Sequence, residues 1–235
     1  MAAALGWGAL AASSMIIGAL LGVARPWPDR IIGLVLAFGA GALISAVSFD
    51  LAQEGIRLGG GDSVAIGLAA GAVTYFLADR VIERPKAGAA TGGEGPALAL
   101  GAFLDGIPEQ MVLGIGLVTG DGVSVGLLAA IFVSNLPEAI GSATEMRSSG
   151  QRDVTILRLW IAVAAVTTLA TVVGYAIADS ASGDLQATIN GFAAGALLVM
   201  LIDSMIPAAT RKAHDLAGLA SVLGFAVAAG LSNVS

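Results

Sequence analysis

Two short segments of the chain place carboxylates beside prolines. Asp105 and Glu109 stand four residues apart around Pro108, and in the second segment Glu138 directly follows Pro137. Residues four apart in a helix lie on one face, and a proline inside a helix leaves one backbone carbonyl without its usual donor. Two such helices side by side would offer carboxylate and carbonyl oxygens, which are the ligands that hard divalent cations prefer.

Polar residues next to the second proline extend this set. Ser134 lies four residues before Glu138, and Asn135 lies three residues before it. In a helix these spacings put a hydroxyl, an amide and a carboxylate on one side. Small polar residues also join neighbouring helices in membranes, and this is the alternative interpretation of Ser134 and Asn135.

The composition places these carboxylates in a membrane protein. Apolar residues make up 57% of the 235 residues, charged residues make up 12%, and the mean hydropathy is +0.89. Soluble proteins average about 25% charged residues. No cysteine is present, which excludes disulfides and thiolate metal sites. These values exclude a soluble enzyme, a disordered chain and a nucleic-acid binder, and they predict an all-α integral membrane protein.

Eight stretches are apolar and long enough to cross a bilayer, which needs about 20 residues per helix. The eight predicted helices run over residues of about 2–24, 31–57, 63–82, 96–118, 122–146, 154–178, 185–209 and 214–233. They form a single transmembrane domain over residues 1–235, with one long, flexible cytoplasmic loop at 83–95.

Basic residues mark the orientation. Ten of the eleven Lys and Arg residues fall on one side of the predicted topology, and only Arg57 falls on the other. Loops rich in Lys and Arg face the cytoplasm, so both termini are expected outside. The low charge and the single basic belt favour a bacterial inner membrane.

Two internal repeats relate the predicted helices. FGAGAL at 38–43 and FAAGAL at 192–197 match at an offset of 154 residues. Phe, Pro and Glu in 103–109 match those in 132–138 at an offset of 29. The related helices run in opposite directions, as in the inverted repeats of secondary transporters. The predicted arrangement is three helices, a central pair and three inverted helices.

Six acids are predicted to lie within the membrane. They are Asp50, Glu54, Asp105, Glu109, Glu138 and Asp203. No basic residue or histidine is expected at their depth, and a charged, unpaired carboxylate there costs about 2.5–3.5 kcal/mol. Protonation, a water-filled cavity or a bound cation must therefore neutralise these acids, and each indicates an ion or proton path. For Asp50, Glu54 and Asp203, which lie toward helix ends, simple contact with water is the alternative.

With these motifs the chain resembles the ZIP family of divalent-metal transporters. Helices 4 and 5 of that family carry His-Asn-x-Pro-Glu-like and His-x-x-Pro-Glu-like signatures. Both Pro-Glu pairs are kept here, and Asn135 stands at a polar position of the family. Asp105 and Ser134 replace the histidines, and Gly106 replaces a ligand. The resemblance covers nearly the whole chain. It implies a metal site between helices 4 and 5, a path lined by helices 2, 4, 5 and 7, and elevator-like motion of that unit that carries ions toward the cytoplasm.

The resemblance also assigns roles to the acids. Glu109 and Glu138 would be primary ligands of one or two ions, completed by Asp105, Asn135 and Ser134. Asp203 would be a ligand on the cytoplasmic side, whereas Asp50 and Glu54 would attract cations outside. Because imidazole suits zinc and oxygen donors suit harder ions, the substrate expected is Mn²⁺ or Fe²⁺, with Zn²⁺ also accepted by carboxylates.

We expect no catalytic residue, no enzyme activity and no cofactor apart from the transported metal. The expected partners are metal ions, the lipid bilayer and a second copy in a homodimer. Two other functions stay open. The same acids would serve a proton-coupled carrier or proton channel, or the chain would be a non-transporting membrane scaffold that keeps the fold.

Overall fold

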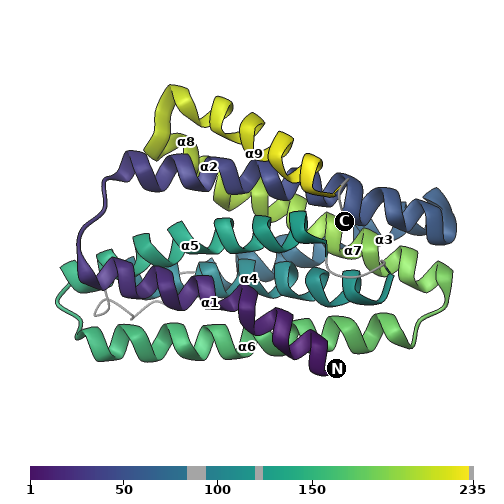
Figure 1. The fold of residues 1–235 in the computed structure, drawn as a ribbon, viewed down its shortest axis with the longest axis horizontal. Coiled ribbons are helices and arrows are strands. Elements are labelled where there is room, and N and C mark those ends of the chain that lie inside the picture. The colour runs from purple at the N-terminus through teal and green to yellow at the C-terminus, as the bar shows by residue number, and fades with distance from the viewer. Residues whose placement is uncertain (84–93, 120–123, 233–235) are drawn as a thin grey trace.

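Every regular element in the described part of the chain is a helix. The computed structural model describes residues 1–83, 94–119 and 124–232, with side chains at 1–80, 106–118 and 124–231. The all-helical class expected from the composition is confirmed. Helices α1 and α9 bring the first and last described residues toward the same end of the bundle (Figure 1).

The described part of the chain contains long and short helical segments. The long ones are α1 (Ala2–Ala24), α2 (Asp29–Ala46), α3 (Glu54–Glu83), α4 (Glu94–Thr119), α5 (Val125–Ser148), α6 (Asp153–Asp179), α7 (Gly183–Met200) and α9 (Ala217–Ser232). The short ones are α8 (Ile206–Ala213), two π-helical segments, η1 (Val47–Gln53) and η2 (Leu201–Met205), and a 3₁₀ turn, η3 (His214–Leu216). Most of the predicted loop 83–95, residues 84–93, lies outside the described residues.

Five helical segments in the described chain are long and apolar enough to cross a membrane. They are Ala2–Ala24, Asp29–Arg80, Val125–Ser148, Asp153–Asp179 and Gly183–Leu231. Two of them contain 52 and 49 residues, about 75 Å of straight helix, far more than a bilayer core of about 30 Å. Each is broken by a residue with positive φ, Gly60 at +83° and His214 at +51°. The eight crossings and the three–two–three arrangement stay a prediction that these breaks favour.

The glycine run Gly59–Gly61 and Gly150 mark short turns in the sequence, and the structure has a sharp turn at both places. Gly60, within the run Gly59–Gly61, has φ +83° and ψ 168° and interrupts α3. Gly150, between α5 and α6, has φ +82°. Only glycine adopts this left-handed backbone region without steric penalty, so these positions set where the chain reverses.

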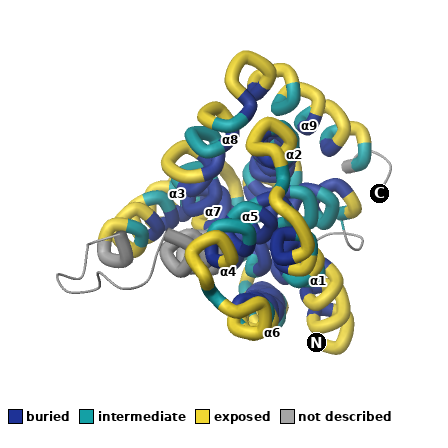
Figure 2. The backbone as a smooth tube through the Cα atoms, turned by 90° about the vertical axis from the view of Figure 1, so that its left-hand side faces the viewer, coloured by how far each residue is buried: buried dark blue, intermediate teal, exposed yellow. Residues whose placement is uncertain are grey.

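The helices pack in two groups. In the first, α1, α4, α5 and α6 contact one another. In the second, α2 packs on α8 and α9, and α3 packs on α7. Figure 2 shows α8 and α9 on one side of the bundle and α6 on the opposite side, with the buried residues between them. The groups meet mainly where α2 contacts α5, α4 contacts α7 and α5 contacts α9.

Repeat-related glycines make related close contacts within the second group. A Cβ added to Gly41 of α2 would overlap the carbonyl oxygen of Ser221 on α9. A Cβ added to Gly195 of α7 would overlap the carbonyl oxygen of Leu68 on α3. Gly41 and Gly195 are the equivalent glycines of the two FxAGAL segments. Small residues therefore bring the two repeat-related helix pairs into backbone contact, a common form of packing in membranes.

Two glycines of α9, the helix that packs on α2, test this packing. Gly224 of α9 lies against the carbonyl oxygen of Phe38, whereas nothing lies within 4 Å of a Cβ added to Gly230 on the same helix. We expect Gly224→Ala to lower the free energy of unfolding by about 1–3 kcal/mol, because α2 and α9 must separate. Gly230→Ala is the matched control and should be neutral or stabilise by up to about 1 kcal/mol. Thermal unfolding in detergent measures both, and equal shifts in Tm would contradict the close contact.

Candidate metal or proton site between α4 and α5

The structure joins the two proline-containing helices through one buried carboxylate. Glu109 of α4 is 1% exposed, and Ser134 and Asn135 of α5 are 0% and 1% exposed. The Ser134 hydroxyl donates to Glu109 Oε1 at 3.0 Å, and Asn135 Nδ2 donates to Glu109 Oε2 at 2.5 Å. Both carboxylate oxygens of Glu109 therefore accept hydrogen bonds from α5. The contact lies between the two helices that the sequence predicted to form the site.

The same two donors also bond to their own helix. The Ser134 hydroxyl and Asn135 Nδ2 both lie within hydrogen-bond distance of the Ile131 carbonyl oxygen, at 3.0 and 2.9 Å. An amide nitrogen has two hydrogens, so Asn135 uses one for Glu109 and one for its helix. The Ser134 hydroxyl has a single hydrogen, so it donates to only one of its two acceptors at a time. The two bonds of Asn135 orient its amide with the nitrogen, not the oxygen, toward Glu109.

Small residues and apolar side chains close the site on two sides. A Cβ added to Gly106 of α4 would lie 2.7 Å from Met15 Cε and 3.0 Å from Thr167 Cγ2. On the α2 side, a Cβ added to Gly39 would lie 2.9 Å from the Cα atom of Ser134. A side chain at position 106 would therefore meet side chains of α1 and α6, and α2 covers the Ser134 segment directly.

The other predicted central ligands are only partly described. Glu138 is half-buried on α5, one turn after Ser134, and follows the buried Pro137. Asp105 lies in α4, but its side chain is outside the described residues. Among the described side chains, no group of three or more Asp, Glu, His or Cys residues is close enough to hold a metal ion. A cage of several carboxylates thus stays a prediction.

The electrostatics of Glu109 determine what this site can bind. Ser134 and Asn135 are neutral, so they satisfy the hydrogen bonds of the carboxylate without cancelling a negative charge. A charged carboxylate in a low-dielectric interior is costly unless it is paired, and a proton or a cation would remove this cost. Cation binding would require the Asn135 amide to turn so that its Oδ1 replaces Nδ2. The site can therefore take part in metal binding or proton transfer.

One of the predicted outer acids has a basic partner that the sequence analysis missed. Arg57 contacts both carboxylate oxygens of Glu54, with Nε and Nη2 each 2.7 Å away. The expectation that no basic residue accompanies these acids is wrong for Glu54. The helix continues past Glu54, which places Arg57 one turn further on the same face. Arg57 is 72% exposed, so the pair contributes at most about 1 kcal/mol.

The remaining predicted acids lie in π-helical segments. Asp50 is half-buried in η1, and Asp203 is exposed in η2. The two segments begin at Val47 and Leu201, which are again 154 residues apart. A π turn adds a residue to the helical repeat and is frequent at functional sites. The internal repeat is the only sequence signal that relates the two segments, and it does not itself predict a π turn.

A buried glutamine beside the site has a structural role. Gln110 is 0% exposed, and its Oε1 accepts a hydrogen bond from Thr171 Oγ1 at 2.5 Å. Its Nε2 donates to the Gly8 carbonyl oxygen at 3.4 Å. Both ends of this amide are engaged by α6 and α1, so Gln110 fixes α4 within the first packing group.

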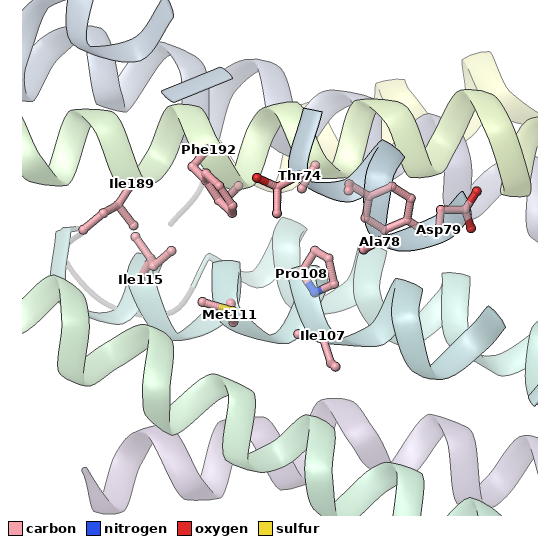
Figure 3. A pocket seen from close by; sticks show the side chains of 12 residues that line it. Thr74, Ala78, Asp79, Ile107, Pro108, Met111, Ile115, Ile189 and Phe192 are labelled. Carbon is pink, nitrogen blue, oxygen red and sulfur yellow. The ribbon is translucent and has the colours of Figure 1, made fainter. Parts of the chain in front are cut away.

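An apolar cavity of about 220 Å³ lies between α3, α4 and α7. Figure 3 shows Pro108, Met111 and Ile115 of α4 facing Ile189 and Phe192 of α7 across it. The cavity borders the turn of α4 that carries Glu109, yet none of Glu109, Ser134 and Asn135 lines it. The polar contact of Glu109 with Ser134 and Asn135 thus lies outside this cavity.

A double-mutant cycle tests the polar contact. We expect Asn135→Leu to lower the free energy of unfolding by about 2 kcal/mol, because a hydrogen bond to a buried charged group is lost. In a Glu109→Gln background the same change should be weaker by at least about 0.5 kcal/mol. Thr168→Val is the control, since the buried Thr168 hydroxyl bonds only to Ala164 of its own helix. Additive effects in chemical unfolding would contradict a direct Asn135–Glu109 contact.

These features define a helical membrane protein with a buried acid at the centre of its bundle. No protein-family model matches the chain. A protein of Arabidopsis thaliana named a "putative zinc transporter" is 29% identical to it over 189 residues. The matched region is 77% of this chain and 30% of the plant protein, so the chain spans less than a third of that relative's length.

Proposed function

We propose that this protein carries a divalent metal cation across a membrane toward the cytoplasm. The observation that supports this most is the buried Glu109 carboxylate, which reaches across from α4 to Ser134 and Asn135 of α5. The similarity to a protein named as a zinc transporter supports metal transport in general. The apolar helical segments support a location in a membrane.

The proposed ligands share oxygen chemistry. Glu109 and Glu138 bind one or two ions, and Asp105 completes the contribution of α4. Asn135 and Ser134 contribute an amide oxygen and a hydroxyl after they release Glu109. Oxygen donors without imidazole or thiolate favour Mn²⁺ or Fe²⁺, and carboxylates also accept Zn²⁺. The chemistry is ligand exchange with proton release, and no covalent step is needed.

The outer and inner acids guide the ion to and from the centre. Asp50 and Glu54 attract cations outside, and Glu54 exchanges Arg57 for the arriving ion. Asp203 in η2, exposed at the other end of the path, receives the ion on the cytoplasmic side. Both termini lie outside in this arrangement, and the chain crosses the membrane eight times.

The packing suggests which helices move together. A path lined by α2, α4, α5 and α7 follows the interface between the two packing groups. These four helices contact one another through α2–α5, α4–α5 and α4–α7, and in addition α4 and α5 contact α1 and α6, α2 contacts α9 and α7 contacts α3. We therefore propose α1, α4, α5 and α6 as an alternative to the expected moving unit of α2, α4, α5 and α7; either unit would slide as an elevator against the other helices.

A proton-coupled carrier or proton channel is the second candidate. The observation that favours it is that the described side chains include no cluster of three metal-binding groups. In that case Glu109 passes a proton to an acid nearby, and metal has no role.

Uptake by liposomes containing the purified protein tests the proposal. We expect saturable uptake of at least one of Mn²⁺, Fe²⁺, Zn²⁺ and Cd²⁺. Glu109→Gln should lower the initial rate about tenfold or more, because the loss of a charged ligand is worth at least about 1.4 kcal/mol. Asp215→Asn, which alters an exposed acid at the start of α9, is the control and should transport normally.

Two results would go against metal transport. The absence of saturable flux for any of the four ions, in protein shown to be folded, contradicts it. Proton flux that follows the pH gradient and ignores added metal supports the second candidate. Normal uptake by Glu109→Gln would remove the buried site from the mechanism.

A further inference from the structure

Asn190 of α7 is a buried amide without a partner in the described part of the chain. Its side chain is 0% exposed, and neither Nδ2 nor Oδ1 makes a hydrogen bond to the described residues. An amide offers two donor hydrogens and an acceptor oxygen, and leaving them unmade in a protein interior is costly. Such a group in a native structure needs an explanation, for example a ligand or ion that binds it.

Packing alone does not require an amide at this position. The residue equivalent to Asn190 in the internal repeat, at the offset of 154, is Leu36 of α2. Leu36 is 3% exposed and belongs to the apolar core. Since the repeat-related helices pack through equivalent glycine contacts, leucine fills this kind of position well. The polar atoms of Asn190 therefore serve something other than packing.

Asn190 lies beside the segment that carries the outer acids. Its Cβ is 3.3 Å from the position of a Cβ added to Gly55. Gly55 directly follows Glu54 and comes five residues after Asp50 of η1. η1 ends at Gln53 and α3 begins at Glu54, so Asp50, Glu54 and Gly55 belong to one continuous helical stretch. The amide is thus next to the stretch that carries Asp50 and Glu54.

The depth of Asn190 follows from its neighbour. Ile189 lines the apolar cavity opposite Ile115 of α4 (Figure 3). Ile115 is six residues beyond Glu109, or about 9 Å along the helix. Asn190 therefore lies about 9 Å from the level of Glu109, toward the end of α4 that is predicted to face outside.

We propose that Asn190 is a further cation-binding residue, located between the outer acids and Glu109. Its Oδ1 binds the partly hydrated divalent cation directly or through a water of hydration, and its Nδ2 donates to a water oxygen of the same ion. The inference rests on the proposed transport function and adds α7 to the helices that supply ligands.

The repeat provides the test variant. Asn190→Leu places at this position the residue found at its repeat equivalent, so we expect the variant to fold with an unchanged or higher Tm. In liposomes loaded through a Mn²⁺ or Zn²⁺ gradient, its KM for the metal should rise at least threefold. Asn190→Asp, of the same size, should lower KM because a carboxylate binds the cation more strongly than an amide. Thr188→Val, at a half-buried position on the same helix, is the control and should keep the wild-type KM.

The outcomes separate this inference from the transport proposal. Wild-type KM in Asn190→Leu, with active wild-type protein, overturns the role of Asn190 and leaves metal transport standing. If Asn190→Leu fails to fold, a KM for Asn190→Asp equal to or above that of the wild type overturns it as well. If the wild-type protein shows no saturable uptake, metal transport and the role of Asn190 fail together.

Discussion

A charged carboxylate buried between two helices is costly unless a proton or an opposite charge offsets it. This cost is the main physical constraint on the site formed by α4 and α5. Glu109 is almost fully removed from solvent, and both of its oxygens accept hydrogen bonds from neutral side chains of α5. These bonds make burial tolerable, yet they leave the net charge of an ionised carboxylate in place. A proton or a cation bound at such a site would offset that charge.

The packing of the bundle supports such a site. Glycines at Gly41, Gly195, Gly71 and Gly224 bring helix backbones of the second group into contact, and Gln110 fixes α4 to α1 and α6 in the first. The polar centre lies in the first group, next to the interface with α2 and α7. Two firmly packed groups with a polar site near their boundary are well suited to relative movement, because the contacts within each group can persist while those between the groups change.

Much of this arrangement could be predicted from the sequence. The spacing of Pro and Glu, with Ser134 and Asn135 one turn before Glu138, placed the polar centre on two neighbouring helices, and the contact from Glu109 to Ser134 and Asn135 confirms that α4 and α5 meet there. The glycine run at Gly59–Gly61 predicted the chain reversal at Gly60. These predictions succeed because they depend on local periodicity and on backbone conformations that few residues adopt.

Other features depend on three-dimensional contacts that no local pattern encodes. The π turns of η1 and η2 change the direction of Asp50 and Asp203 without a distinguishing residue. The pair of Glu54 with Arg57 is an exception, because both residues lie in the predicted helix 31–57 and their i,i+3 spacing could have indicated the contact. The isolation of Asn190 depends on which residues happen to surround α7, and only its comparison with Leu36 makes the amide stand out. The sequence singles out these acids by their predicted depth in the membrane. It does not show which residues surround each of them.

Metal binding by Glu109 is tested most directly by an anomalous-scattering map from crystals soaked in Mn²⁺ and, separately, in Zn²⁺. Our account predicts a peak within coordination distance of the Glu109 carboxylate, between α4 and α5, with the Asn135 amide turned to present its oxygen. Peaks confined to exposed acids at the helix ends, with Glu109 still held by Ser134 and Asn135, would contradict it.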